Sequence, residues 1–113
     1  MALNNQIMNN YDFLRGMYND GYFPDFLVEK IKKILIDLCE KIEQQNPPDN
    51  DSLLVLTHAA TELINKLDEE FGENDSELET VAREVIAENF ETIVKAYGFD
   101  AVDIEDVIAS REW

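Results

Sequence analysis

The sequence of 113 residues has little of what specialised sites usually require. Its single cysteine, Cys39, cannot form an internal disulfide, and its single histidine, His58, cannot provide the several ligands of a structural zinc site. Three prolines and four glycines are the only strong helix breakers, and no Gly-rich phosphate-binding loop is present. We therefore expect a reducing compartment, a buried and inert thiol, no metal and no cofactor.

Long apolar segments are also missing. The longest uninterrupted apolar run, Leu53 to Leu56, is far shorter than the roughly 20 residues that a helix needs to cross a bilayer. The first ten residues lack the basic start and the apolar stretch of a signal peptide. These two absences predict a cytoplasmic protein that does not insert into a membrane.

Basic residues are scarce. The sequence has nine Lys and Arg residues and 25 Asp and Glu residues, which gives a formal net charge of -16. Such a charge argues against nucleic acid and anionic membranes as direct partners, and favours a basic protein. Residues 68–113 hold 15 of the acids and three of the bases, so this part of the chain carries -12 of the -16.

Between the few breakers, apolar residues recur every three or four positions, which is the period of a helix. This pattern predicts long helices over about 24–45, 50–72 and 76–98, with short helices over 10–19 and 103–111. Loops of about six residues favour antiparallel neighbours. We predict an all-α fold: a small antiparallel helical bundle with three long helices and short N- and C-terminal helices.

The domain boundaries follow from the same pattern. Residues 9–113 are expected to form a single helical domain, and residues 1–8 a disordered extension. Asn74, Asp75 and Ser76 are N-cap candidates for the last long helix, and Ser76 with Glu79 has the spacing of a capping box. The predicted core residues are Leu35, Leu38, Leu63, Leu67, Val85, Ile86 and Phe90.

Four glutamates on the predicted helix 76–98 project within about 60° of one another, opposite its apolar stripe. They are Glu77, Glu84, Glu88 and Glu91. This ridge is either a solvated helix face or a docking surface for a basic protein. The concentration of negative charge in this half of the chain leads us to predict a non-enzymatic acidic interaction protein, an inhibitor or immunity-like factor.

His58 and Glu62 lie one helical turn apart and form an alternative site. Together with carboxylates of the helix 76–98, they could serve a small enzyme or a metal-dependent binding protein. Helical projection places His58 about 175° from the centre of the apolar stripe, which predicts a solvent-exposed ring. A surface pair without a catalytic role is the simpler interpretation.

Aromatic residues are concentrated near the N-terminus, where one short helix cannot bury all of them. Tyr11, Tyr18 and Tyr22 form a possible aromatic surface, because tyrosine rings are common at interfaces. Packing onto the bundle is the alternative. A homo-oligomer built on these aromatics is also left open.

Four segments carry a family resemblance: residues 17–24 (MYNDGYFP), 57–62 (THAATE), 79–84 (ETVARE) and 111–113 (REW). Over about residues 8–113 the chain resembles a family of small uncharacterised bacterial proteins. The resemblance implies a bacterial cytosolic protein of unknown function and assigns no catalytic residue. In size, class and charge alone, the chain is also similar to bacterial immunity proteins that neutralise basic nuclease toxins.

Overall fold

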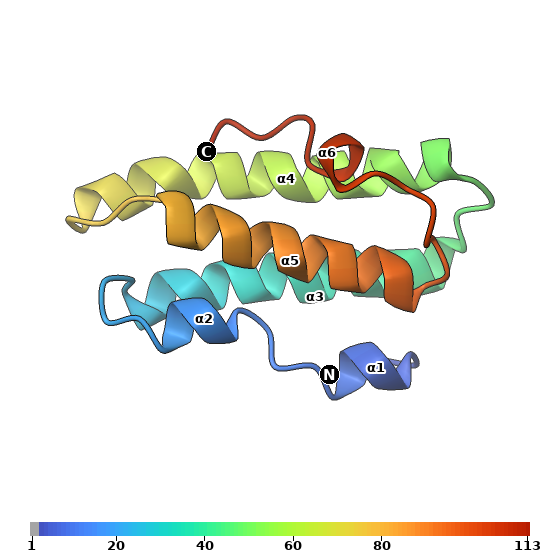
Figure 1. Ribbon diagram of the computed structural model, residues 1–113, viewed down its shortest axis with the longest axis horizontal. Coiled ribbons are helices and arrows are strands. Elements are labelled where there is room, and N and C mark those ends of the chain that lie inside the picture. Colours follow the sequence, from blue (N-terminus) through green and yellow to red (C-terminus); the bar gives the residue numbers. More distant parts are fainter. Residues whose placement is uncertain (1–2) are drawn as a thin grey trace.

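The computed structural model describes residues 3–113, and its helices account for 67% of these residues (Figure 1). Residues 3–113 contain no strand, which confirms the predicted all-α bundle. The long helices are α3 (Asp25–Gln45), α4 (Asn50–Glu73) and α5 (Thr80–Ala96). The short helices are α1 (Gln6–Asn9), α2 (Arg15–Tyr18) and α6 (Ile104–Val107).

Helices α3 and α4 pack side by side and run antiparallel, and α5 also runs antiparallel to α4 (Figure 1). As a result, α3 and α5 run in the same direction and end at the same end of the bundle. Helix α2 packs against α3 and α5, and α6 packs against both α4 and α5. Within residues 3–113, no helix has the length and apolar character needed to span a bilayer.

Among the long helices, α4 is the one that begins at a side-chain cap. The Asp49 side chain accepts a hydrogen bond from the Ser52 N–H at 2.8 Å and starts α4 as an N-cap. The predicted capping box at Ser76 is wrong, because α5 begins at Thr80. The Ser76 hydroxyl instead donates to the Tyr22 carbonyl at 3.2 Å, so this side chain ties an extended segment to the turn before α3.

One hydrophobic cluster runs through the molecule, and much of the predicted core is confirmed. Leu35, Leu38, Ile86 and Phe90 are all buried. Leu67 and Val85 are only half-buried. The prediction for Leu63 is wrong, since 43% of this residue is exposed.

The buried side of α4 includes two threonines. Thr57 and Thr61 are fully buried, and their hydroxyls donate to the Leu54 and Thr57 carbonyls of the same helix. Because the hydroxyls are satisfied within the helix, the threonines fit a core at little cost. Because threonine is a polar residue type, a pattern based on apolar residues alone predicts Leu63, and not Thr57 or Thr61, on the buried side.

The N-terminal segment differs from the predicted extension. Residues 1 and 2 lie outside the described residues, but Leu3 and Met8 are buried against the bundle. Asn5 caps α1 by accepting hydrogen bonds from the Ile7 and Met8 N–H groups, and its amide donates to the Ala96 carbonyl at 2.7 Å. Apolar burial and long-range hydrogen bonds therefore hold residues 3–8 in place, where the sequence predicted disorder.

The predicted helix 10–19 is reduced to α2, because residues 10–13 are not helical and Leu14, just before α2, has a left-handed backbone with φ of 58°. This conformation is unfavourable for a residue with a Cβ atom. The buried Asn89 side chain of α5 accepts a hydrogen bond from the Leu14 N–H at 3.0 Å and donates one to the Val85 carbonyl at 2.7 Å. Asn89 therefore fixes the turn that leads into α2.

Gly16 allows α2 to approach α5 closely. A Cβ atom at Gly16 would lie 2.8 Å from Val85 Cγ2, and the β-branched Val85 has little freedom to move away. Gly16→Ala is therefore expected to lower the free energy of unfolding by about 1–3 kcal/mol. Gly72→Ala is the matched control, since nothing lies within 4 Å of that position and alanine favours helix. Urea unfolding of both variants should show opposite signs, and a stabilising Gly16→Ala would contradict the close approach.

Candidate functional site

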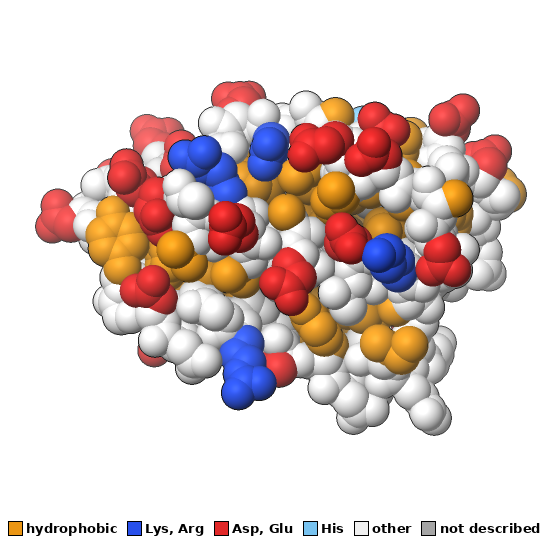
Figure 2. Space-filling view, viewed as in Figure 1, with side chains coloured by type: hydrophobic (Ala, Val, Ile, Leu, Met, Phe, Trp, Pro, Cys, Tyr) orange, Lys and Arg blue, Asp and Glu red, His pale blue; other side chains and the backbone are white. Residues whose placement is uncertain are grey.

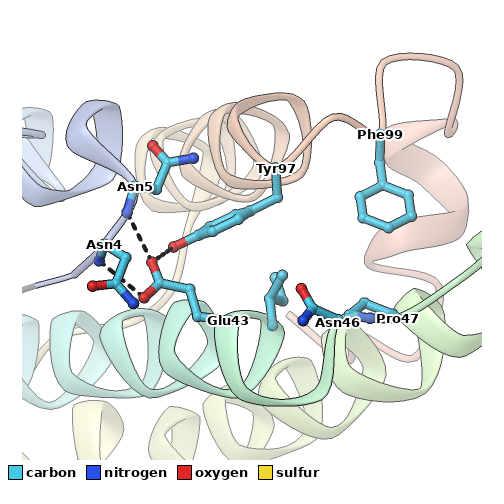
Figure 3. A pocket seen from close by; sticks show the side chains of 8 residues that line it. Asn4, Asn5, Glu43, Asn46, Pro47, Tyr97 and Phe99 are labelled. Atoms are coloured by element: carbon cyan, nitrogen blue, oxygen red, sulfur yellow. Dashed lines mark hydrogen bonds between the residues drawn. The ribbon is translucent and has the colours of Figure 1, made fainter.

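A pocket of about 450 Å³ lies at the end of the bundle where α3 and α5 both terminate. Figure 3 shows that three parts of the chain form it: the end of α3, the residues after α5, and the N-terminal segment. Glu43 and Tyr97 point toward each other on one side of the pocket, and Phe99 and Asn46 lie on the other side (Figure 3).

Two helix-ending turns place these residues. Asn46 adopts a left-handed conformation with φ of 45°, and its N–H donates to the Ile42 carbonyl, which ends α3. Gly98, with φ of 92°, ends the helical path after α5, and the Phe99 N–H then donates to the Val94 carbonyl at 2.9 Å. This turn directs Phe99 toward α3, so the two helix ends form opposite walls of the pocket.

Glu43 is the charged group of the pocket. Its carboxylate accepts hydrogen bonds from the Asn4 N–H at 2.9 Å, from the Asn5 N–H at 3.1 Å and from the Tyr97 hydroxyl. Partial desolvation raises the pKa of Glu43, but these three hydrogen bonds outweigh it and hold the pKa below its ordinary value. The carboxyl is therefore ionised at neutral pH.

The buried Cys39 thiol lies near Tyr97. Burial raises the pKa of Cys39 to about 12, so the thiol stays protonated and is a poor nucleophile. Burial and the hydrogen bond to Glu43 also raise the pKa of the Tyr97 hydroxyl. The pocket thus offers one carboxylate, amides and aromatic rings, a set that is suited to binding.

No local sequence motif marks this pocket. Glu43 is one of 25 acidic residues, and nothing in its local sequence distinguishes it. The helical period places Tyr97 on the apolar face of the last long helix, and its ring does pack against the core. Gly98 was the available signal, because a glycine at a helix end turns the following residue back onto the bundle.

The four glutamates of the predicted ridge do not share one helix. Glu84, Glu88 and Glu91 lie on the solvent side of α5, whereas Glu77 lies in the extended segment before it. Glu91 is half-buried and forms an ion pair with Lys95 at 2.9 Å. Glu77, Glu84 and Glu88 are exposed.

His58 is half-buried beneath α6, which corrects the expected solvent-exposed ring. Its Nε2 atom donates to the Asp106 carbonyl at 2.7 Å, since a carbonyl can only accept. Two turns further along α4, the Asn65 side chain donates to the Ser110 carbonyl and accepts from the Glu112 N–H. His58 and Asn65 therefore hold the C-terminal segment against α4. A helical projection describes one helix alone, so it could not predict that α6 covers His58.

In the part of the chain that the structure describes, none of the carboxylates of the alternative site forms an ion pair with His58. Glu62 is exposed on α4, and Glu84 and Glu88 are exposed on α5. Within residues 3–113, no three His, Cys, Asp or Glu side chains are grouped so that they could hold a metal ion.

The three tyrosines of the predicted aromatic surface occupy different environments. Tyr11 is half-buried and packs edge-on against Phe13. Tyr18 is half-buried, and its hydroxyl donates to Glu29 at 2.6 Å. Tyr22 is 46% exposed and lies beside the segment that contains Ser76. Of the three, Tyr22 is the one that presents its ring to solvent.

The fold and the pocket define a small all-α bundle with a pocket at the end where α3 and α5 terminate. The chain belongs to the family of unknown function DUF5713, whose family model matches residues 7–113. This match confirms the family resemblance in the sequence. No curated protein and no solved structure matches the chain.

Proposed function

We propose that this protein is a non-enzymatic acidic interaction protein that engages a basic protein partner, as an inhibitor or immunity-like factor. The observation that carries the proposal is the charge of residues 68–79, a run with seven acidic residues and no basic residue. The run includes the end of α4 and the segment leading to α5. Figure 2 shows carboxylates prominent at this end of the molecule.

The position of this charge works against stability. Helix α4 has no basic residue in its last turn, although the negative end of a helix dipole favours cations there. Glu69 and Glu73 are exposed and lie one turn apart, where like charges repel. Their placement is unfavourable for the isolated chain and becomes favourable when a cationic surface approaches.

The acidic residues continue from α4 onto α5. We define the acidic surface by six exposed residues: Glu69, Glu73, Asp75, Glu77, Glu84 and Glu88. Among the ion pairs of residues 3–113, none involves these six carboxylates. Their negative charge is therefore available to attract a partner over a distance of about 8 Å at physiological ionic strength.

Exposed apolar groups lie beside the acidic surface. Tyr22, through its carbonyl, contacts Ser76 of the acidic segment, and Val81 in the first turn of α5 is 40% exposed. Tyrosine is enriched where protein interfaces gain most of their affinity. The combination of an aromatic group with surrounding carboxylates supports a protein partner rather than a small ion.

The test is the simultaneous change of four members of the acidic surface, Glu73, Glu77, Glu84 and Glu88, to Gln. A partner would be captured from cell extract on the wild-type chain and purified. Its association rate should fall steeply between about 50 and 500 mM salt, and should be markedly lower for the four-Gln variant at low salt. The fold should persist, because glutamine keeps nearly the same shape and helix propensity.

A matched control removes the same net charge elsewhere. Asp12→Asn, Glu40→Gln, Asp51→Asn and Glu62→Gln lie outside α5 and the segment before it. This variant should retain most of the association rate. An equal fall of the association rate in the four-Gln variant and in the control variant would show that only net charge matters. An unchanged association rate in the four-Gln variant would show that the acidic surface does not bind the partner.

A further inference from the structure

The carboxylate of Glu43 has no cationic partner within residues 3–113. The four ion pairs of this part of the chain involve other residues. All three groups that donate to Glu43 are neutral: two backbone N–H groups and the Tyr97 hydroxyl. One bond falls on Oε1 and two on Oε2, so an acceptor position on Oε1 is left. The pocket therefore contains a negative charge that is oriented but not neutralised.

The backbone adds further negative potential at the same place. Helices α3 and α5 both end at the pocket, and the end of a helix carries a partial negative charge and carbonyl oxygens without helical partners. Helix α3 has no basic residue in its last turn. Lys95 in the last turn of α5 is already paired with Glu91. Both helix ends therefore favour a cation in the pocket.

The walls select among cations. Tyr97 and Phe99 place aromatic rings on two sides of the space, and Asn46 adds a side-chain amide (Figure 3). A guanidinium group is planar, weakly hydrated and stacks on aromatic faces, whereas an ammonium group is compact and strongly hydrated. An anion would meet the Glu43 carboxylate and two negative helix ends. This combination favours a guanidinium group.

We propose that the pocket between Glu43, Asn46, Tyr97 and Phe99 is a binding site for a guanidinium group. Glu43 accepts a charge-assisted hydrogen bond, and the rings of Tyr97 and Phe99 contact the cation's faces. The group comes either from a small molecule or from an arginine side chain of another protein. The site lies apart from the acidic surface, so it does not depend on the function proposed above.

The experiment is an NMR titration of the full chain with argininamide. Amide shifts should be concentrated around Glu43, Asn46, Tyr97 and Phe99, with a dissociation constant in the millimolar range that is usual for so few contacts. Citrullinamide, which has nearly the same shape without the side-chain charge, should bind at least about tenfold more weakly. Lysinamide should fall between the two. Amide shifts spread over acidic residues throughout the chain would overturn the proposal. Equal affinities for citrullinamide and argininamide would also overturn it.

Variants separate the pocket from general charge attraction. Glu43→Gln should weaken argininamide binding about tenfold or more, since it removes the charge and keeps the shape. Phe99→Ala leaves Glu43 and its three hydrogen bonds in place, so it tests the aromatic wall even if Glu43→Gln loosens the N-terminal segment. Glu84→Gln removes one charge from the acidic surface and should leave argininamide binding unchanged. Equal effects of Glu84→Gln and Glu43→Gln would overturn the proposal.

A capped tripeptide, acetyl-Gly-Arg-Gly-amide, distinguishes the two sources of the group. Tighter binding of the peptide than of argininamide would identify an arginine side chain of a protein, because the peptide adds backbone on both sides of the arginine and lacks the α-ammonium group of argininamide. Weaker binding would identify a small molecule with its own amine. Loss of binding by both probes in Phe99→Ala is expected in either case, and retention of both would contradict the pocket.

Discussion

Phe71→Ala is expected to lower the free energy of unfolding by about 3–5 kcal/mol. Phe71 is fully buried near the end of α4, and its ring packs edge-on against Phe23 with 6.5 Å between the ring centres. Its carbonyl also accepts hydrogen bonds from the Asn74 and Ser76 N–H groups, which form the turn toward α5. Loss of the ring would leave a cavity between α4 and the segment before α3.

Leu63→Ala is the matched control on the same helix. Because 43% of Leu63 is exposed and alanine favours helix, this change should cost less than about 1 kcal/mol. Urea unfolding followed by circular dichroism would give both values. Similar losses in the two variants would mean that α4 is rotated relative to the structure described here.

Asn89→Asp is expected to lower the free energy of unfolding by more than about 3 kcal/mol at neutral pH. Asn89 is 3% exposed, and its amide donates to the Val85 carbonyl at 2.7 Å. In the variant, a carboxylate oxygen would face that carbonyl in an apolar environment. Asn89→Ala should cost less, about 1–3 kcal/mol, because it leaves the Leu14 N–H unpaired without burying a charge.

The pH dependence provides an internal check on Asn89→Asp. Burial raises the pKa of the introduced carboxyl in the folded state above its unfolded value of about 3.9. The deficit relative to wild type should therefore be small below about pH 4, where the carboxyl is protonated in both states, and should grow as the pH rises through the folded-state pKa. A deficit of the same size at pH 4 and pH 7 would show that the carboxylate reaches water.

Most of the long helices were predictable because their signals are local. The apolar stripe of α3 ends at Asn46 and Pro47, and Gly98 marks the end of α5, as the sequence predicted. The start of α5 was not predictable in the same way. Ser76 has the sequence of a cap, but its hydroxyl is used for a contact with Tyr22, which lies 54 positions away in the chain.

The candidate sites show the same division. Periodicity placed Glu84, Glu88 and Glu91 on one side of a helix, and the structure agrees for these three. It did not place His58 correctly, because α6 covers that side of α4. It did not identify Glu43, because the Tyr97 hydroxyl and the Asn4 and Asn5 N–H groups approach this carboxylate from other parts of the chain.

The sequence by itself determined the all-α class, the three long helices and the strong negative charge of residues 68–113, because period, capping and charge are properties of neighbouring residues. Only the tertiary structure decided which side of α4 is buried, where the C-terminal segment lies, and that Glu43, Tyr97 and Phe99 surround one pocket. These features depend on contacts between distant segments, and such contacts are set by how whole helix faces pack together.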